Sequence, residues 1–180
     1  RGFFFDEEES GLVGSKAYVK NNSLDSLLGV YNMELVGNGD KIVFWSDGNL
    51  FNGLLLKTIK KQAKYLNIKT KEFPKMRKIL GPQISGDHLS FSERGINESF
   101  CMTTITQNDI DMIKKLLFNP LNWVNPQRVD INKAISSLSV FKHYHKSSDK
   151  SEYVNEKTMQ MVSDLIYNSI CSIDNSLINL

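Results

Sequence analysis

The sequence has 180 residues, of which 41% are hydrophobic, so it can bury one core and we expect a single domain over residues 1–180. Its 22 basic and 20 acidic residues give a net charge of +2, so nothing in the composition argues for nucleic acid and none is expected as a partner. No apolar run is long enough to cross a bilayer, so no membrane segment is expected. Cys101 and Cys171 belong to no metal-spaced motif; a buried free thiol is expected for each, with a disulfide as the alternative.

The first half of the chain alternates between strand and helix signals. The first expected elements are a buried strand over residues 2–6, a helix over 11–20 and strands over 28–36 and 41–45. A helix then begins at Asn49, and its apolar face consists of Leu50, Leu54, Leu55, Ile59, Ala63 and Leu66. A strand over 68–73 follows and is stopped by Pro74. Residues 76–86 contain Gly81-Pro82 and predict a loop.

The second half continues the alternation. It predicts a strand over 98–106, helices near 109–117 and 131–138, and a long helix from Glu156 with Met159, Val162, Ile166 and Ile170 facing inward. This order indicates an α/β fold, a three-layer sandwich whose central mixed sheet has helices on both faces.

A run of four acidic residues, 6–9, joins the first strand to a helix that starts near Gly11. In open α/β sheets, ligand-binding and catalytic groups gather where strands end and helices begin. Of the adjacent Glu8 and Glu9, one could hold a metal while the other moves a proton. The alternative is a solvated turn whose charge complements the helix N-terminus.

Three later segments follow the acidic run in order: 31–37 (YNMELVG), 86–91 (GDHLSF) and 144–149 (YHKSSD). With residues 5–15 they resemble the C-terminal part of M28-type zinc peptidases, the aminopeptidase and glutamate carboxypeptidase-like group. Members of that family read roughly F-D-x-E-E-x-G-L-x-G-S, N-L-D-M-x-G, S-D-H-x-x-F and Y-H-T-x-x-D. The resemblance covers residues 1 to about 178 and implies the zinc-exopeptidase fold, and four ordered motifs are more specific than any one.

The resemblance assigns roles to particular residues. It implies that Glu8 is the general base and that Glu9 and His145 are zinc ligands. Lys146 stands where the family usually has Thr, which affects the local loop geometry. His143 lies two residues from His145 but lacks the family's flanking residues, so we rank it below His145.

Glu34 occupies the position of the Asp that binds the other zinc in the family. Its extra methylene moves the carboxylate relative to that Asp, which leaves three alternatives. The metal site has adjusted to the longer side chain, the second metal site is weakened or altered, or Glu34 does not bind the metal and only contacts its ligands. Asp87 and His88 match S-D-H, with Gly86 in place of Ser. The resemblance implies that this pair supports the metal ligands or the substrate side. Tyr144 and Asp149, which flank His145, are assigned the same supporting role.

The family also uses an H-x-D motif and a metal-bridging Asp, both N-terminal to the Glu-Glu pair. The chain opens at Arg1 directly on a core-type strand, so we expect it to be a piece of a longer protein. Glu9, Glu34 and His145 would then be three of five ligands for two zinc ions. We expect them to converge with Glu8 on one cleft, with empty or poorly occupied metal positions, and the isolated piece to be inactive.

The expected function is metal-dependent peptide hydrolysis with a peptide as substrate, and an aminopeptidase is the favoured form. One alternative is a glutaminyl cyclase-like acyltransferase, which uses a single zinc and typically has Trp where this chain has Tyr144. Another is a non-catalytic relative that serves as a binding module, suggested by Glu34. Residues 108–138 replace the family's short loop and predict a helical insertion, favoured as a stabilising surface addition over a substrate-shaping lid.

Overall fold

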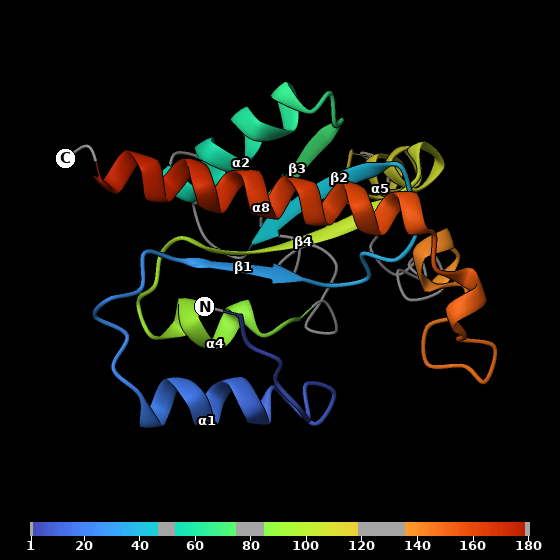
Figure 1. Cartoon of the computed structure of the whole chain (residues 1–180). Helices are drawn as coiled ribbons and strands as arrows, with labels where there is room; N and C mark the ends of the chain where they lie inside the picture. The colour runs from blue at the N-terminus through green and yellow to red at the C-terminus, as the bar shows by residue number, and fades with distance from the viewer. Residues whose placement is uncertain (1, 47–52, 75–84, 119–135, 179–180) are drawn as a thin grey trace.

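The computed structural model describes residues 2–46, 53–74, 85–118 and 136–178. At its centre is a four-stranded mixed sheet (Figure 1). Along the sheet the strands are β1 (Val30–Met33), β4 (Ser99–Ile105), β2 (Lys41–Ser46) and β3 (Thr70–Pro74). The β1–β4 and β2–β3 pairs are parallel, and the central β2–β4 pair is antiparallel.

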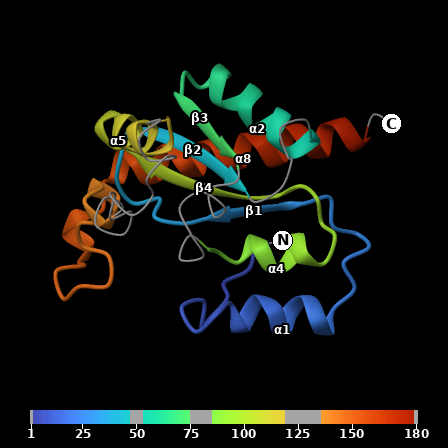
Figure 2. The ribbon, with the colours of Figure 1, turned by 180° about the vertical axis from the view of Figure 1, so that it is seen from behind.

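Both faces of the central strands are buried, because β2 and β4 are covered on each side. On one face Ile42, Phe44, Phe100 and Met102 pack against α2 (Leu54–Tyr65) and α8 (Glu156–Ile178), which lie along the same side of the sheet in Figures 1 and 2. The opposite face is covered by α5 (Gln107–Phe118) and the short helix η2 (Ser139–Phe141); the buried side chains there are Val43, Trp45, Phe73, Cys101, Ile105, Ile110, Ile113 and Leu138. The predicted sandwich with helices on both faces is confirmed.

Two further helices lie beside β1. Helix α4 (His88–Glu93) contacts β1 and β4, and α1 (Val13–Asn21) packs on α4 (Figures 1 and 2). The hydroxyls of Ser15 and Ser90 are 2.8 Å apart between the two helices. The two stacked helices therefore lie at the edge of the sheet that β1 forms, with α4 between α1 and that strand.

The prediction of a strand over residues 2–6 is wrong: these residues form no strand. Two of their three aromatic side chains instead contact the two helices, with Phe3 on Tyr18 and Phe5 on both Tyr18 and Phe91, while Phe4 is fully exposed. A short apolar run forms a strand only where a neighbouring strand completes the hydrogen-bond ladder, and residues 2–6 pair with no described strand.

The helix predicted from Asn49 begins later, at Leu54, because Gly53 before it has an extended backbone. The carboxylate of Glu98, 44 residues away, accepts hydrogen bonds from the Leu54 and Leu55 amides at 2.8 and 2.5 Å. A remote carboxylate therefore satisfies amides that a helix start leaves unpaired. Residues 49 and 50 lie outside the described part.

The C-terminal helix begins at Glu156 as predicted, but its inward face is rotated. Val162 is buried and Ile166 packs against the core, whereas Met159 and Ile170 are 45% and 47% exposed. Thr158 is buried because its hydroxyl donates to the Gly39 carbonyl at 2.6 Å. The other buried positions on this helix are Leu165, Ser169 and Ile173.

The remaining predictions mostly hold where residues are described. The predicted strands over 28–36, 41–45, 68–73 and 98–106 correspond to β1, β2, β3 and β4, and the helices over 11–20 and 109–117 to α1 and α5. The predicted loop and the second helix of the insertion lie largely outside the described residues. Both cysteines are free thiols as expected; Cys101 is buried, whereas Cys171 is only partly buried, so the expected burial is confirmed for Cys101 alone.

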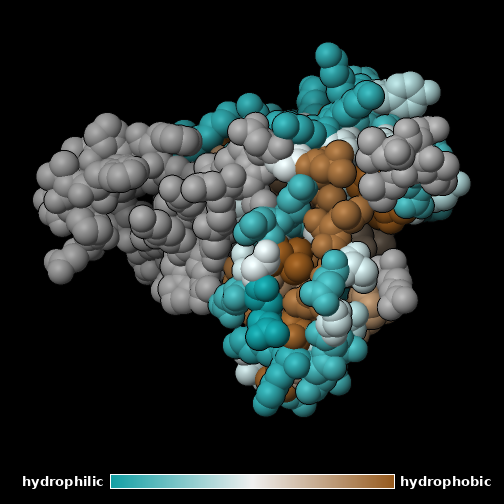
Figure 3. All heavy atoms as spheres, turned by 90° about the vertical axis from the view of Figure 1, so that its left-hand side faces the viewer, coloured by the Kyte–Doolittle hydropathy of each residue, from teal (hydrophilic) through white to brown (hydrophobic). Residues whose placement is uncertain are grey.

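The described part of the chain contains no helix long and apolar enough to span a membrane. Large apolar side chains nevertheless reach the surface, and Figure 3 shows a band of them between hydrophilic groups. The exposed set includes Phe4, Leu28, Met33, Leu54 and Tyr65.

Candidate functional site

The loop that carries Glu8 and Glu9 is folded tightly against the start of α1. The amides of Gly11 and Leu12 donate to the Glu8 carbonyl at 3.0 and 2.8 Å, and the amide of Gly14 donates to the Asp6 carbonyl at 3.2 Å. A Cβ at Gly14 would lie 2.7 Å from that carbonyl oxygen, so this close approach requires glycine. The glycines of the acidic motif thus fix where the two glutamates lie.

Glu34 follows immediately after the C-terminal end of β1, and its amide donates to the Met102 carbonyl of β4 at 3.0 Å. The next residue, Leu35, has a left-handed backbone with φ of 53°, so the chain turns there. The Asn32 amide group donates to Glu34 Oε1 at 2.9 Å. The Glu34 carboxylate therefore sits at the end of a parallel strand pair, where α/β folds gather ligand-binding groups.

The third contribution comes from the C-terminal part of the chain. The Tyr144 hydroxyl donates to Glu9 Oε1 at 2.9 Å, and His145 Nε2 lies 2.6 Å from the same oxygen. The rings of Tyr144 and His145 are stacked with centroids 3.8 Å apart. His145 has a φ of 56°, a conformation that non-glycine residues adopt rarely. Residues 136 positions apart are thus in direct contact.

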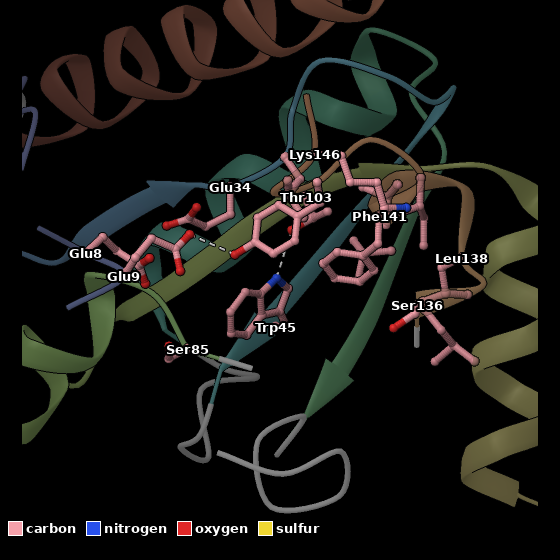
Figure 4. Close-up of a pocket in the computed structure, with 16 residues that line it drawn as sticks. Glu8, Glu9, Glu34, Trp45, Ser85, Thr103, Ser136, Leu138, Phe141 and Lys146 are labelled. Atoms are coloured by element: carbon pink, nitrogen blue, oxygen red, sulfur yellow. Dashed lines mark hydrogen bonds between the residues drawn. The ribbon is translucent and has the colours of Figure 1, made fainter. Parts of the chain in front are cut away.

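Glu8, Glu9, Glu34 and Tyr144 line one pocket with a volume of about 320 Å³. His145 is not among its lining residues and reaches the site through its contact with Glu9. Figure 4 shows Glu8, Glu9 and Glu34 at one end of it, whereas Phe141 and Leu138 lie toward the other. Trp45 lines the middle, and its indole N–H donates to the Thr103 hydroxyl at 3.0 Å. The remaining lining residues are Leu35, Val43, Ser85, Ile105, Ile113, Ser136, Val140, Tyr144 and Lys146. The pocket is therefore acidic at one end, and the rest of its wall is mainly apolar with a few polar side chains, among them Thr103, Ser136 and Lys146.

The carboxylates influence one another. Burial, together with the negative charges of Glu8, Asp87 and Glu9, raises the pKa of Glu34 to about 7, against the lowering effect of the hydrogen bond from Asn32. Burial, Glu9 and Asp87 also raise the pKa of Glu8. Burial and the bond to Glu9 raise the pKa of the Tyr144 hydroxyl, which stays a proton donor. A cation placed among these groups would relieve the repulsion between them.

Asp87 and His88 lie next to the carboxylates and not in the pocket wall. Asp87 raises the pKa of both Glu8 and Glu34 through its charge, so it lies close to both. Its Oδ1 is buried and bonded to no described residue. The His88 ring is fully buried edge-on against Trp45, with centroids 4.9 Å apart. His88 thus supports the pocket through Trp45, which lines it.

Two other candidates point elsewhere. His143 stacks on Tyr153 with ring centroids 3.9 Å apart, and its Nδ1 lies 3.1 Å from the Ser148 hydroxyl. Asp149 is exposed in the turn after His145 and lines no part of the pocket. Neither contacts Glu8, Glu9 or Glu34 in the described structure.

The donor set suits a zinc ion chemically, since carboxylate oxygens and imidazole nitrogens are among its usual ligands. Glu9 and His145 already meet, and Glu34 lines the same pocket. As the side chains stand, no three His, Cys, Asp or Glu residues of the described ranges are grouped closely enough to hold a metal. The residues therefore fit a metal by type and by convergence, with Glu9 and His145 as the pair already in place.

The apolar part of the site was not predicted from the sequence. Val43 and Trp45 belong to the predicted strand over 41–45, Leu138 is the last residue of the predicted insertion, and Phe141 belongs to no predicted motif, yet all four line the pocket. One available signal is the spacing of Thr106 and Asp109, a T-x-x-D capping pattern at the start of α5. Asp109 also bonds to Ser139 and so ties the pocket wall to this helix.

A mixed α/β sheet with an acidic pocket beyond the end of a parallel strand pair is typical of α/β enzymes. The model of Peptidase family M28 matches residues 2–170, so the chain belongs to this family of metallopeptidases. No curated protein and no solved structure matched the chain.

Glu34 and Gly86 differ together from the family pattern, and the structure links them. A Cβ at Gly86 would lie 2.8 Å from Asn32 Nδ2 and 3.2 Å from Glu34 Oε1, so the missing side chain leaves room for the longer acid. A role for Glu34 as a zinc ligand predicts that Gly86→Ser, by displacing Glu34, lowers zinc affinity and turnover by about tenfold. Adding Glu34→Asp should restore much of the loss, because the shorter acid vacates that space.

Zinc stoichiometry and kcat/KM of the two single variants and the double variant would test this coupling. Gly2→Ser is the matched control, since a Cβ at Gly2 has nothing within 4 Å. Strictly additive effects would contradict the link between the two positions. If Glu34→Asp alone leaves both metal content and activity unchanged, Glu34 is not a ligand.

His88 makes the stability of the fold depend on pH. Burial lowers the pKa of its ring to about 3, whereas an unfolded histidine titrates near 6.5. Between these values the unfolded chain binds the proton and the folded protein does not. The free energy of unfolding should therefore fall by about 1.4 kcal/mol per pH unit as the pH drops below 6.5.

Denaturant unfolding between pH 7 and pH 4 would measure this slope in the protein and in His88→Leu. We expect His88→Leu to remove this part of the slope, and His143→Leu, at a half-exposed ring, to keep it. An unchanged slope in His88→Leu would show that His88 does not titrate as described.

Proposed function

We propose that the protein is a zinc-dependent exopeptidase that removes residues from the N-terminus of a peptide. The observation that carries this proposal is the convergence of Glu8, Glu9 and Glu34 at one end of a single pocket, with Tyr144 and His145 bonded to Glu9. Membership of Peptidase family M28 supports the hydrolytic chemistry.

In this proposal Glu9 and His145 hold a zinc ion, and Glu34 contributes to a second. Zinc, when bound, polarises a peptide carbonyl and makes a neighbouring water more acidic. Glu8 is not bonded to Glu9 or His145 and lines the same end of the pocket, so it is the group left to take the proton from the attacking water. Its raised pKa brings it nearer to the operating pH, which suits a general base that later gives the proton to the leaving amine.

The charges around the pocket favour an aminopeptidase. Three carboxylates line one end, whereas Lys146 is the cation among the lining residues that the structure describes. The Lys146 ammonium donates to the Lys142 carbonyl at 2.6 Å, in its own turn. A free peptide ammonium group would therefore be attracted to the acidic end. The apolar wall formed by Trp45, Leu138 and Phe141 would then receive the first side chain.

The second candidate is a glutaminyl cyclase-like acyltransferase that works with one zinc. The raised pKa of Glu34 favours it, because a carboxyl that keeps its proton near neutral pH is a poor ligand for a second ion. Tyr144 before His145, where such cyclases typically have Trp, favours the peptidase.

The test is a substrate panel with the full-length gene product loaded with zinc. It comprises leucyl-nitroanilide, the same compound with an acetylated N-terminus, and a peptide that begins with Gln. We expect cleavage of the free amine, no cleavage of the acetylated compound, and loss of activity on chelation that zinc restores. Ring closure of the Gln peptide without hydrolysis would favour the cyclase, and turnover insensitive to chelation would refute both.

A further inference from the structure

Asp109, a buried carboxylate at the start of α5, is bonded to the segment that forms one wall of the pocket. Asp109 lies in the first turn of α5 with its side chain 2% exposed. Its Oδ2 accepts from the Thr106 amide at 3.2 Å and from the Thr106 hydroxyl at 2.9 Å, and the Asp109 amide donates to the Thr106 hydroxyl oxygen at 3.2 Å. This reciprocal pair is a capping box that fixes the start of the helix.

The capping box does not use all of the carboxylate. Oδ1 of Asp109 accepts from the Ser139 amide at 2.7 Å, and Oδ2 accepts from the Ser139 hydroxyl at 2.5 Å. Burial alone would raise the pKa of Asp109, but the bonds from Ser139 and Thr106 together lower it, so the group stays charged. A charged acceptor with several short hydrogen bonds makes a strong attachment between positions 30 residues apart.

Ser139 is the start of a short, internally bonded segment that leads to the site. The amides of Phe141, Lys142 and Tyr144 donate to the carbonyls of Leu138, Ser139 and Phe141 at 3.1, 3.2 and 3.3 Å. Phe141 and Tyr144 meet edge to face with ring centroids 5.4 Å apart, and Tyr144 stacks on His145. A shift at Ser139 would therefore be passed along six residues to the two side chains that contact Glu9.

We infer that Asp109 is a positioning residue of the proposed peptidase site, acting through Ser139 to hold residues 138–146 as one wall of the pocket. This wall packs on the core cluster that contains Trp45 through the side chains of Leu138, Val140 and Phe141. The hydrogen bonds from Ser139 to Asp109 fix the position of the wall along α5. The inference rests on the proposed function for the roles of Tyr144 and His145, but the attachment itself belongs to the resting protein.

Ser139→Ala is the sharpest test, because it removes one bond to Asp109 and leaves the capping box of α5 intact. Asp109→Asn disturbs both the attachment to Ser139 and the capping box. The matched control is Asp111→Asn on the exposed side of the same helix, where Asp111 bonds to Gln107 and Lys114. Ser139→Thr keeps the hydroxyl and should rescue the wild-type behaviour. All variants are made in the full-length protein in a Trp123→Phe background, so that Trp45 is the fluorophore of this chain.

Two measurements are compared. Acrylamide quenching of Trp45, taken without substrate, should rise at least about twofold in Ser139→Ala and Asp109→Asn, because a loosened wall exposes the indole. In the same variants kcat should fall by about tenfold to a hundredfold with a smaller change in KM, because Tyr144 and His145 lose their places. The control and Ser139→Thr should match the parent in both.

Quenching and kcat that both remain at the parental level in Ser139→Ala would overturn the inference, and this holds even if Asp109→Asn fails to fold. Increased quenching that Ser139→Thr does not rescue would also overturn it. If the parent hydrolyses no peptide, the proposed function fails, while the quenching series still decides whether Asp109 holds the wall.

Discussion

Replacing Glu8 by Gln should lower peptide turnover by about a hundredfold or more while leaving the zinc content nearly unchanged. The amide keeps the shape of the side chain but has no basic oxygen to accept a proton from water. Glu8 lines the acidic end of the pocket, whereas Glu9 makes the contacts with Tyr144 and His145. The change should therefore remove the base and spare the metal ligands. Steady-state kinetics with a chromogenic amino-acid anilide, together with metal analysis of the same sample, would measure both effects.

Glu7→Gln is the matched control, because Glu7 is the exposed neighbour in the same loop and lines no part of the pocket. It should retain parental turnover. Near-normal turnover in Glu8→Gln would remove Glu8 from the mechanism, and loss of zinc in that variant would reassign it as a ligand.

Replacing His145 by Ala should weaken zinc binding by about a hundredfold or more and abolish turnover, since loss of an outer partner alone typically costs ten- to a hundredfold. In the proposed site the imidazole is the nitrogen donor that pairs with Glu9, at 2.6 Å in the described structure. Competition with a chromogenic zinc chelator would give the affinity. Added zinc should restore part of the activity if the ligand is lost but the fold is kept.

His143→Ala provides the comparison, because His143 lies two residues away and stacks on Tyr153 instead of facing the pocket. It should leave zinc affinity unchanged. If the two substitutions weaken zinc binding equally, the assignment of His145 as the ligand is wrong.

Much of the fold could be predicted from local patterns. The structure buries every residue of β2 and β4, which are apolar runs in the sequence. It also buries the regularly spaced Leu55, Ile59 and Ala63 on one face of α2. The failures have a common cause in distant partners. Residues 2–6 lack a described strand partner, the first amides of α2 are bonded by the distant Glu98, and Thr158 on the inward face of α8 is bonded to the distant Gly39.

The acidic half of the pocket was easier to predict than the apolar half. Four residues of the recognised motifs line one pocket, namely Glu8, Glu9, Glu34 and Tyr144. Their motifs contain the residue types that bind metals and transfer protons. Trp45, Leu138 and Phe141 are ordinary core residues in the sequence, and a site made of such residues becomes visible only when the chain is folded. Asp109 is an intermediate case, since its capping pattern was readable but its bond to Ser139 was not.

Anomalous X-ray scattering at the zinc edge, from crystals of the full-length protein grown with zinc, tests the central claim most directly. We expect an anomalous peak bonded to both Glu9 and His145 at about 2.0–2.2 Å, with Glu8 facing it from the same pocket. A zinc ion bound elsewhere, or Glu9 and His145 turned away from each other in the presence of zinc, would contradict it.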